Sequence, residues 1–191
     1  MLIDDLHDTL GSKSIRLKKG EYVFTQGQSV ENIFCVIQGR VRLMRQTIEG
    51  APIVIHVAFA GESIAEASLF SEKYHCSALV DIGAEIAVFS KKTLLNRLQT
   101  SPKLTLSLLQ QMTVSVRDLR MLNEIKSIYS AQERVLTFLR AEFKQEQELD
   151  LSLKDIAQKI GLSHEAFYRT IKTLETEGRI CRSGRHLELV D

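Results

Sequence analysis

The sequence predicts an α+β protein with an N-terminal β-roll (jelly roll), a long helix, and a C-terminal winged helix-turn-helix. Three observations predict it. Short apolar runs separated by glycines fill residues 15–90, an unbroken apolar stripe follows over 101–128, and two short helices joined by a glycine come near the end. We therefore expect three parts, at residues 1–100, 101–128 and 129–191.

Composition and charge are those of an ordinary globular protein. The 191 residues are 44% hydrophobic and 26% charged, and the net charge of +1 carries no global signal for nucleic acid. No apolar run is long enough to span a bilayer, and the acidic start does not read as a signal peptide, so we expect a cytoplasmic protein without a membrane partner. The scattered Cys35, Cys76 and Cys181 make neither a disulfide framework nor a metal motif, and we expect no metal and no cofactor.

Residues 15–90 have the pattern of short strands. Glycines at 20, 27, 39, 50 and 61 recur at intervals typical of a sandwich, barrel or jelly roll. Gln38-Gly39-Arg40 predicts one tight hairpin and Glu49-Gly50 another. The apolar runs that we expect as strands are 22–24, 33–37, 41–44, 53–59, 77–80 and 86–89.

The pattern becomes helical after residue 90. A short helix is expected over 91–99, and Ser101-Pro102 begins a longer one of about 37 Å. Its stripe could pack on the core of its own domain or join two copies in a parallel coiled coil, and its length favours a homodimer. The expected interface residues are Leu104, Leu108, Met112, Val116, Leu119 and Leu122, and the stripe continues to Ile125.

The last third of the chain predicts a helix-turn-helix. Ser130 to Glu133 and Ser152 to Asp155 are capping boxes that start two helices, with a polar loop over 144–150 between them. Gly161 permits a tight turn and Ser163 can cap the next helix, whose buried side would hold Phe167, Ile171 and Leu174. Gly178 ends that helix, and residues 180–190 form a hairpin that turns at Ser183-Gly184.

Positive charge is concentrated on this motif. From Lys159 to His186 there are six basic and three acidic residues, whereas the whole of 131–191 has ten basic and eleven acidic ones. An ordinary pair of packed helices is the alternative interpretation. Because the glycine turn, the cap, the basic face and a trailing wing coincide, we favour DNA binding, with the second helix in the major groove.

A series of short motifs runs through the chain from about Leu17 to its end. They are Lys19-Gly20, Gln26-Gly27, Ile33-Phe34, Ile37 to Val41, Gly61 to Phe70, Ser77-Ala78, Ser101-Pro102, Gln111-Met112 and the helix-turn-helix. In these motifs the chain resembles the catabolite activator/FNR (Crp/Fnr) family of dimeric transcription regulators. The resemblance implies a cyclic-nucleotide-binding-like sensor domain, a dimerisation helix and a DNA-binding domain. It also implies double-stranded DNA, a second copy and RNA polymerase as partners.

The resemblance also implies roles for residues of the recognition helix. Where the family has Ser-Arg-Glu-x-x-x-Arg, this chain has Ser163-His164-Glu165 followed by Arg169. Glu165 would accept from a cytosine amino group and Arg169 would bind guanine with two hydrogen bonds, while His164 departs from the family pattern. A helix-capping role is the alternative for Glu165. The complete expected DNA-binding set is Ser163, His164, Glu165, Tyr168, Arg169, Lys172, Arg182 and Arg185.

The expected effector pocket departs from the family more strongly. The family's phosphate cassette has two glycines and an arginine; here Ala65 and Ser68 replace the glycines and Cys76 replaces the arginine. A buried phosphate without its cation is unfavourable, so we expect that cyclic AMP does not regulate this protein. Its effector is another small molecule, or none. The aligned pocket residues are Glu66, Ala67, Ser68, Cys76, Ser77, Leu119 and Arg120.

Several alternatives stay open at this point. His75-Cys76 could serve a haem or redox role, although an ordinary loop-to-strand junction is favoured, and no cysteine precedes Cys35 to hold an iron–sulfur cluster. The sequence contains no nucleophile elbow, P-loop, zinc-protease or dinucleotide fingerprint, so we do not expect an enzyme. A cyclic-nucleotide module of a kinase or channel would not explain the basic helix-turn-helix. A dimeric sensor that has lost DNA binding is the remaining rival.

Overall fold

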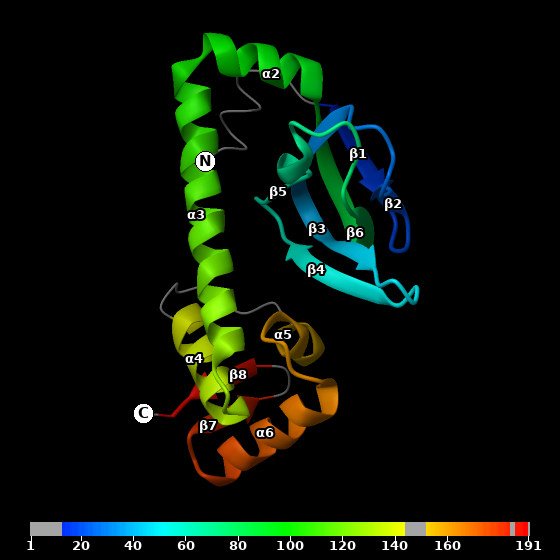
Figure 1. The fold of residues 1–191 in the computed structure, drawn as a ribbon. Helices are drawn as coiled ribbons and strands as arrows, with labels where there is room; N and C mark the ends of the chain where they lie inside the picture. The colour runs from blue at the N-terminus through cyan, green and yellow to red at the C-terminus, as the bar shows by residue number, and fades with distance from the viewer. Residues whose placement is uncertain (1–12, 144–151, 184–185, 191) are drawn as a thin grey trace. The chain divides into compact units, whose positions relative to one another are not determined.

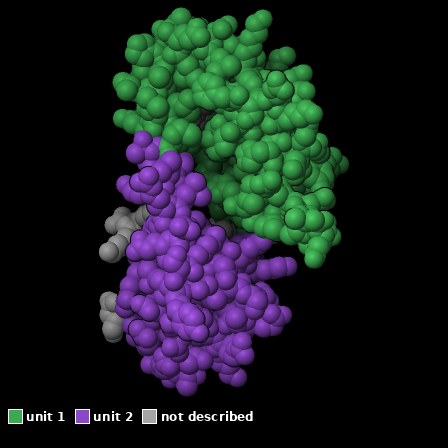
Figure 2. Space-filling view, viewed as in Figure 1, with its two compact units in different colours: residues 1–112 green, residues 113–191 purple. Residues whose placement is uncertain are grey.

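The computed structural model describes residues 13–143, 152–183 and 186–190. The chain forms two compact units, residues 1–112 and 113–191, which we call the N-terminal and C-terminal units (Figure 2). The division falls inside the long helix α3 (Pro102–Ser127), which the sequence analysis expects as a part of its own. Among the described residues, no helix is both long and apolar enough to cross a membrane.

The N-terminal unit is an antiparallel β-roll followed by helices (Figure 1). The sheet has the order β1-β6-β3-β4, with β2 paired to β6 and β5 paired to β3. A short 3-10 helix, η1 (Glu66–Ser68), follows β5, and α2 (Lys91–Thr100) follows β6. The strands are β1 (Lys13–Leu17), β2 (Tyr22–Phe24), β3 (Asn32–Gln46), β4 (Pro52–Ala58), β5 (Ser63–Ile64) and β6 (Ser77–Ser90).

One predicted hairpin is wrong. Gly39 does not turn the chain but lies inside the continuous strand β3, where the pairing with β6 shifts register on both sides of it. Its φ is +90°, and a Cβ at this position would lie 2.3 Å from the carbonyl oxygen of Gly83. The glycine therefore marks a bulge at which two strands approach closely. The second predicted hairpin is confirmed, since Glu49-Gly50 lies in the turn that joins β3 to β4.

The core of this unit is apolar and includes the start of α3. Val36, Val41 and Ile86 are fully buried between the strands, and Leu94 of α2 and Leu104 of α3 pack against them. Burying such side chains stabilises the fold by roughly 1.5–3 kcal/mol each. The first turns of α3 therefore belong to the β-roll core.

This packing corrects the predicted apolar stripe on α3. Leu104 is 1% exposed within the N-terminal unit, and Leu108 packs partly against the same core, so neither offers a free apolar surface. Ile125, at the other end of the stripe, is buried. Met112 and Leu122 are half-buried. The large apolar side chains that α3 leaves exposed are Leu106, Leu109, Val114, Val116 and Leu119.

The C-terminal unit contains the predicted helix-turn-helix and wing. Ser130 accepts a hydrogen bond from the Glu133 amide, and Ser152 accepts one from the Asp155 amide, so both predicted helix starts are confirmed. The predicted loop over 144–150 lies outside the described residues. The elements after α3 are α4 (Ala131–Phe143), α5 (Leu153–Lys159), α6 (His164–Thr176), β7 (Ile180–Ser183) and β8 (His186–Leu189) (Figure 1).

Candidate functional site

The turn between α5 and α6 sets the direction of α6. Gly161 has a φ of +70°, in the left-handed region that glycine adopts most readily, and the Leu162 amide donates to the Ala157 carbonyl oxygen. Ser163 then caps α6 by accepting from the Ala166 amide at 3.1 Å. The tight turn at Gly161 and the cap at Ser163 are therefore confirmed.

Helix α6 has two distinct faces. Phe167, Ile171 and Leu174 are at most 1% exposed and pack inside the C-terminal unit, as predicted. The opposite face carries the side chains that the sequence analysis assigns to DNA, and all of them are exposed. They are His164, Glu165, Tyr168, Arg169 and Lys172, with Ser163 at the cap.

The wing strand β7 extends this exposed face. The Arg182 guanidinium lies over the Tyr168 ring, with 5.7 Å between its central carbon and the ring centroid. Tyr168 also contacts the His164 ring, with 4.5 Å between the ring centroids. A hollow between α6 and β7 is lined by Tyr168, Arg169, Ile171, Lys172, Glu175 and Arg182, so three cations and one carboxylate surround it.

The predicted turn at Ser183-Gly184 lies only partly within the described residues. Ser183 is the last residue of β7 and pairs with His186 of β8. Gly184 and the predicted DNA contact Arg185 lie outside the described residues.

Glu165 is part of the start of α6. Its pKa lies below the usual range because its carboxylate accepts hydrogen bonds from its own backbone amide and from the Ser163 hydroxyl, with smaller contributions from His164 and Arg169. The carboxylate thus occupies the helix-capping role that the sequence analysis keeps as the alternative. The carboxylate is exposed, so its remaining acceptor positions stay open to a donor on a base.

The second candidate site is the cassette around η1. Ala65 adopts the left-handed φ of 72° that a glycine would favour, so this part of the backbone turn persists without glycine. At the second glycine position Ser68 is completely buried, and its hydroxyl lies 2.8 Å from Nδ1 of His75. The Ser68 side chain therefore occupies space that a glycine would leave open.

Two further cassette residues are committed to local contacts. Cys76 is buried, and burial raises the pKa of its thiol, with Glu66 acting in the same direction. Ser77 accepts a hydrogen bond from the Gln26 amide. Cys76 is thus a neutral, buried thiol, whereas the adjacent His75 is exposed, which argues against a shared haem or redox role. No group of three or more described His, Cys, Asp or Glu residues is placed to hold a metal ion.

Glu66 places a carboxylate oxygen in the interior of this unit. Its Oε2 is buried and has no hydrogen-bond partner among the described residues, and burial raises the pKa of its carboxyl. It lines a small, mainly leucine-walled pocket with Ile33, Ser63, Leu69, Leu94, Leu98, Leu104 and Leu108. Of the other aligned pocket residues, Ala67 is exposed beside it, and Leu119 and Arg120 are exposed on α3 in the C-terminal unit.

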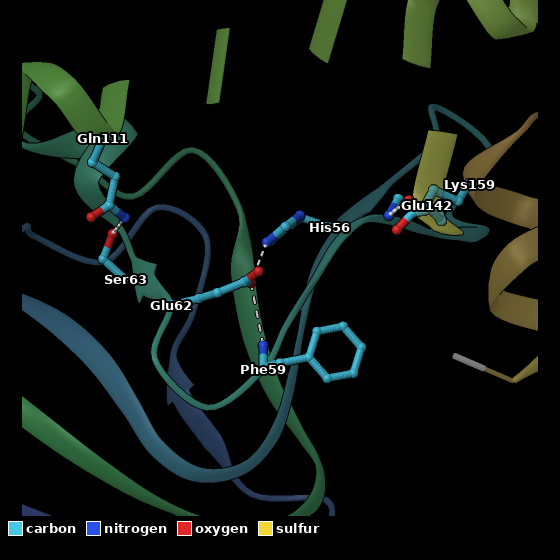
Figure 3. Close-up of polar contacts among 7 residues, drawn as sticks. All are labelled: His56, Phe59, Glu62, Ser63, Gln111, Glu142 and Lys159. Carbon is cyan, nitrogen blue, oxygen red and sulfur yellow. Dashed lines mark hydrogen bonds and ion pairs between the residues drawn. The ribbon is translucent and has the colours of Figure 1, made fainter. Parts of the chain in front are cut away.

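Polar contacts that no sequence pattern indicates lie next to this pocket (Figure 3). Nε2 of Gln111 on α3 donates to the Ser63 hydroxyl at 2.9 Å, which fastens α3 to the β-roll. Glu62 accepts from the Phe59 amide and lies 3.0 Å from Nε2 of His56 on β4. These residues are distant in sequence or lie on a loop without periodicity, so no local sequence pattern predicts the contacts.

Comparison with known proteins gives consistent similarities. Residues 14–101 match the family model of the cyclic nucleotide-binding domain. The transcriptional activator protein Anr of Pseudomonas aeruginosa is 24% identical, over 98% of this chain and 80% of its own. The cAMP-activated global transcriptional regulator CRP of Salmonella typhimurium is 25% identical, over 84% of this chain and 81% of its own.

Solved structures share the fold over both units. FixK2 from Bradyrhizobium japonicum aligns with a TM-score of 0.77 at 20% identity, covering 94% of this chain and 93% of that one. The c-di-GMP responsive regulator CLP of Xanthomonas campestris aligns with a TM-score of 0.75 at 20% identity, covering 100% and 98%. Residues 14–101 thus match a cyclic nucleotide-binding domain, and along nearly its whole length the chain is similar to transcription regulators of the Crp/Fnr type.

Proposed function

We propose that two copies of this chain bind double-stranded DNA and regulate transcription, with α6 in the major groove and the β7–β8 wing beside it. The observation that carries this proposal is the division of α6 into a buried apolar face and an exposed face with Arg169 and Lys172, extended by Arg182 of the wing. Such a face neutralises backbone phosphates and presents side chains to base edges. A regulator of this kind acts where the DNA lies, in the cytoplasm.

Within this face we assign reading of bases to the first turns of α6. Residues near the start of a recognition helix contact base edges, and Arg169 has the fork of donors that matches guanine. Lys172 and Arg182 line the hollow beside it and would bind phosphates. Glu165 would accept a hydrogen bond from a cytosine amino group. His164, which contacts Tyr168, replaces the arginine of the family pattern.

We place the dimer contact on the exposed apolar side chains of α3. Leu109, Val116 and Leu119 follow one another at spacings of seven and three residues, which is the repeat of a two-stranded coiled coil. Met112, half-buried, completes the seam that this repeat defines. This seam replaces the Leu104 and Leu108 positions of the predicted stripe, because those side chains pack inside the N-terminal unit.

We propose that this β-roll does not use cyclic AMP as its effector. The Ser68 side chain occupies the second glycine position, Cys76 is a buried neutral thiol in place of a cation, and Glu66 faces an apolar pocket. An anionic phosphate in such surroundings would lack compensating charge. The protein is then regulated by a less phosphate-like molecule or binds DNA without an effector.

The proposal is tested by selection of genomic fragments with purified protein at a stated salt concentration. We expect enrichment of a pseudo-palindrome whose half-sites lie about 10 base pairs apart from centre to centre. Protein carrying both Arg169→Ala and Lys172→Ala is the matched control and should enrich nothing. If wild-type protein enriches no sequence above random fragments, DNA regulation is refuted. Transcription in vitro from a promoter with the selected site tests the further expectation of contact with RNA polymerase.

A further inference from the structure

One side chain of α4 hydrogen-bonds to backbone carbonyls at two different helix ends. The Arg134 guanidinium donates to the Ile128 oxygen from Nε at 3.1 Å and from Nη2 at 2.6 Å. Its Nη1 donates to the Gly161 oxygen at 3.2 Å and to the Ile160 oxygen at 3.4 Å. Ile128 directly follows α3, and Ile160 and Gly161 directly follow α5. All these residues belong to the C-terminal unit.

The chemistry of these partners makes the contact more than a surface hydrogen bond. The last carbonyls of a helix have no partner inside the helix and carry its negative partial charge. A guanidinium is always charged and presents its donors in a rigid planar fork. A single half-buried Arg134 thus satisfies the ends of α3 and α5 together. No other basic side chain type can present donors in this geometry.

Neighbouring contacts hold the same corner. A Cβ at residue 161 would lie 3.5 Å from Cγ of Lys126 on the last turn of α3, so the helix-turn-helix turn packs directly against α3. Two residues before Arg134, Nε2 of Gln132 donates to Glu177 at the end of α6, at 3.1 Å. The first turns of α4 therefore touch the end of α3 and both helices of the helix-turn-helix.

We propose that Arg134 is a positioning residue that sets the orientation of the helix-turn-helix on α3, and thereby the half-site spacing that the dimer accepts. This inference rests on the proposed function. Because α3 carries the dimer seam, a fixed angle between α3 and α6 fixes the distance between the two recognition helices. One extra base pair moves a half-site by about 3.4 Å along the DNA and turns it by about 35°.

The DNA test uses Arg134→Gln, with Arg140→Gln as the matched control on an exposed position of the same helix. Affinities are measured for the selected operator, for the operator with one inserted base pair, and for a single half-site. When one base pair is inserted between the half-sites, we expect the operator affinity of wild type and of Arg140→Gln to fall about tenfold or more. The affinity of Arg134→Gln should fall less than about threefold. Arg134→Gln should bind the single half-site as wild type does, which also shows that its helix-turn-helix is folded.

Arg134→Lys provides a second variant because it keeps the charge without the fork. We expect the inserted base pair to reduce its operator affinity by a factor between those of wild type and Arg134→Gln. If Arg134→Gln loses half-site and operator affinity by the same factor, or keeps the wild-type response to insertion, Arg134 only supports the local fold and the inference is wrong.

A measurement without DNA separates this inference from the proposed function. Spin labels at residues 117 and 176 report the distance between α3 and α6, in a Cys181→Ser background diluted with unlabelled protein. We expect a narrow distance distribution in wild type and Arg140→Gln and a broadened one in Arg134→Gln. Equal distributions in all three would overturn the inference even where DNA binding is established. If wild type binds no DNA but Arg134→Gln broadens the distribution, the proposed function fails and the positioning role stands.

Discussion

The Tyr168 ring lies beneath the Arg182 guanidinium, with 5.7 Å between the ring centroid and the central guanidinium carbon. This contact links the recognition helix to the wing, so we predict that the two side chains act together in DNA binding. The effects of Tyr168→Ala and Arg182→Ala on the free energy of DNA binding should depart from additivity by about 0.5–1 kcal/mol, the range for an exposed cation–π pair. A double-mutant cycle on DNA affinity measures the coupling. Arg179→Ala, an exposed change before the same strand, should be additive with Tyr168→Ala, and additivity of the Arg182 pair as well would contradict the prediction.

Arg169 is expected to discriminate bases, and Arg182 and Arg185 to bind phosphates. Arg169→Ala should weaken binding to the selected operator by about 1–3 kcal/mol and relax preference at one base pair. Arg182→Ala or Arg185→Ala should weaken all sequences alike and flatten the dependence on salt. Titrations of operator and random DNA at several salt concentrations distinguish these results. Equal losses on both DNAs for Arg169→Ala would show that it does not read a base.

The exposed seam of α3 predicts a parallel homodimer. Leu109→Glu combined with Leu119→Glu would bury like charges at the two-fold axis, so we expect monomers with little affinity for DNA. Sedimentation at micromolar protein measures the change. Arg117→Glu, another exposed position of α3, is the control and should leave the dimer intact. A monomeric wild type would refute the assignment.

Cys35 predicts a loss of stability at alkaline pH. Burial, with a smaller effect of Glu66, raises its pKa to about 12 from an ordinary value of 9.0. The folded state therefore keeps a proton that the unfolded chain loses, and stability falls as pH rises from 9 towards 12. Between pH 9 and 10.5 this group should cost about 1–2 kcal/mol. Urea unfolding at both pH values should show a smaller decrease for Cys35→Ala than for wild type, and equal decreases would contradict the assignment.

The altered cassette predicts that cyclic nucleotides do not bind. Isothermal titration with cyclic AMP and cyclic GMP should give no binding at micromolar concentrations, because Cys76 replaces the arginine of the cassette and Ser68 fills the second glycine position. Glu66→Ala is the control for any heat observed. A micromolar dissociation constant that Glu66→Ala abolishes would show that the cassette still works.

Local patterns in the sequence account for much of the site. The glycine at 161, the cap at Ser163 and the period of Phe167, Ile171 and Leu174 predict the helix-turn-helix, and the exposed face of α6 follows from the same period. Prediction from local turn patterns fails where the pairing of strands that are distant in sequence decides the structure. Gly39 has the local appearance of a turn but is a bulge, because the backbone of Gly83 lies against it.

The sequence by itself determined the element types, the helix caps and the residues of the basic face, because each depends on periodicity or on contacts within a few residues. Only the tertiary structure decided how the apolar side chains of α3 divide between core and surface, since Leu104 and Leu119 are alike in sequence but 1% and 65% exposed. It also decided the role of Arg134, because its partners Ile160 and Gly161 are more than twenty residues away and meet it only when the helices pack.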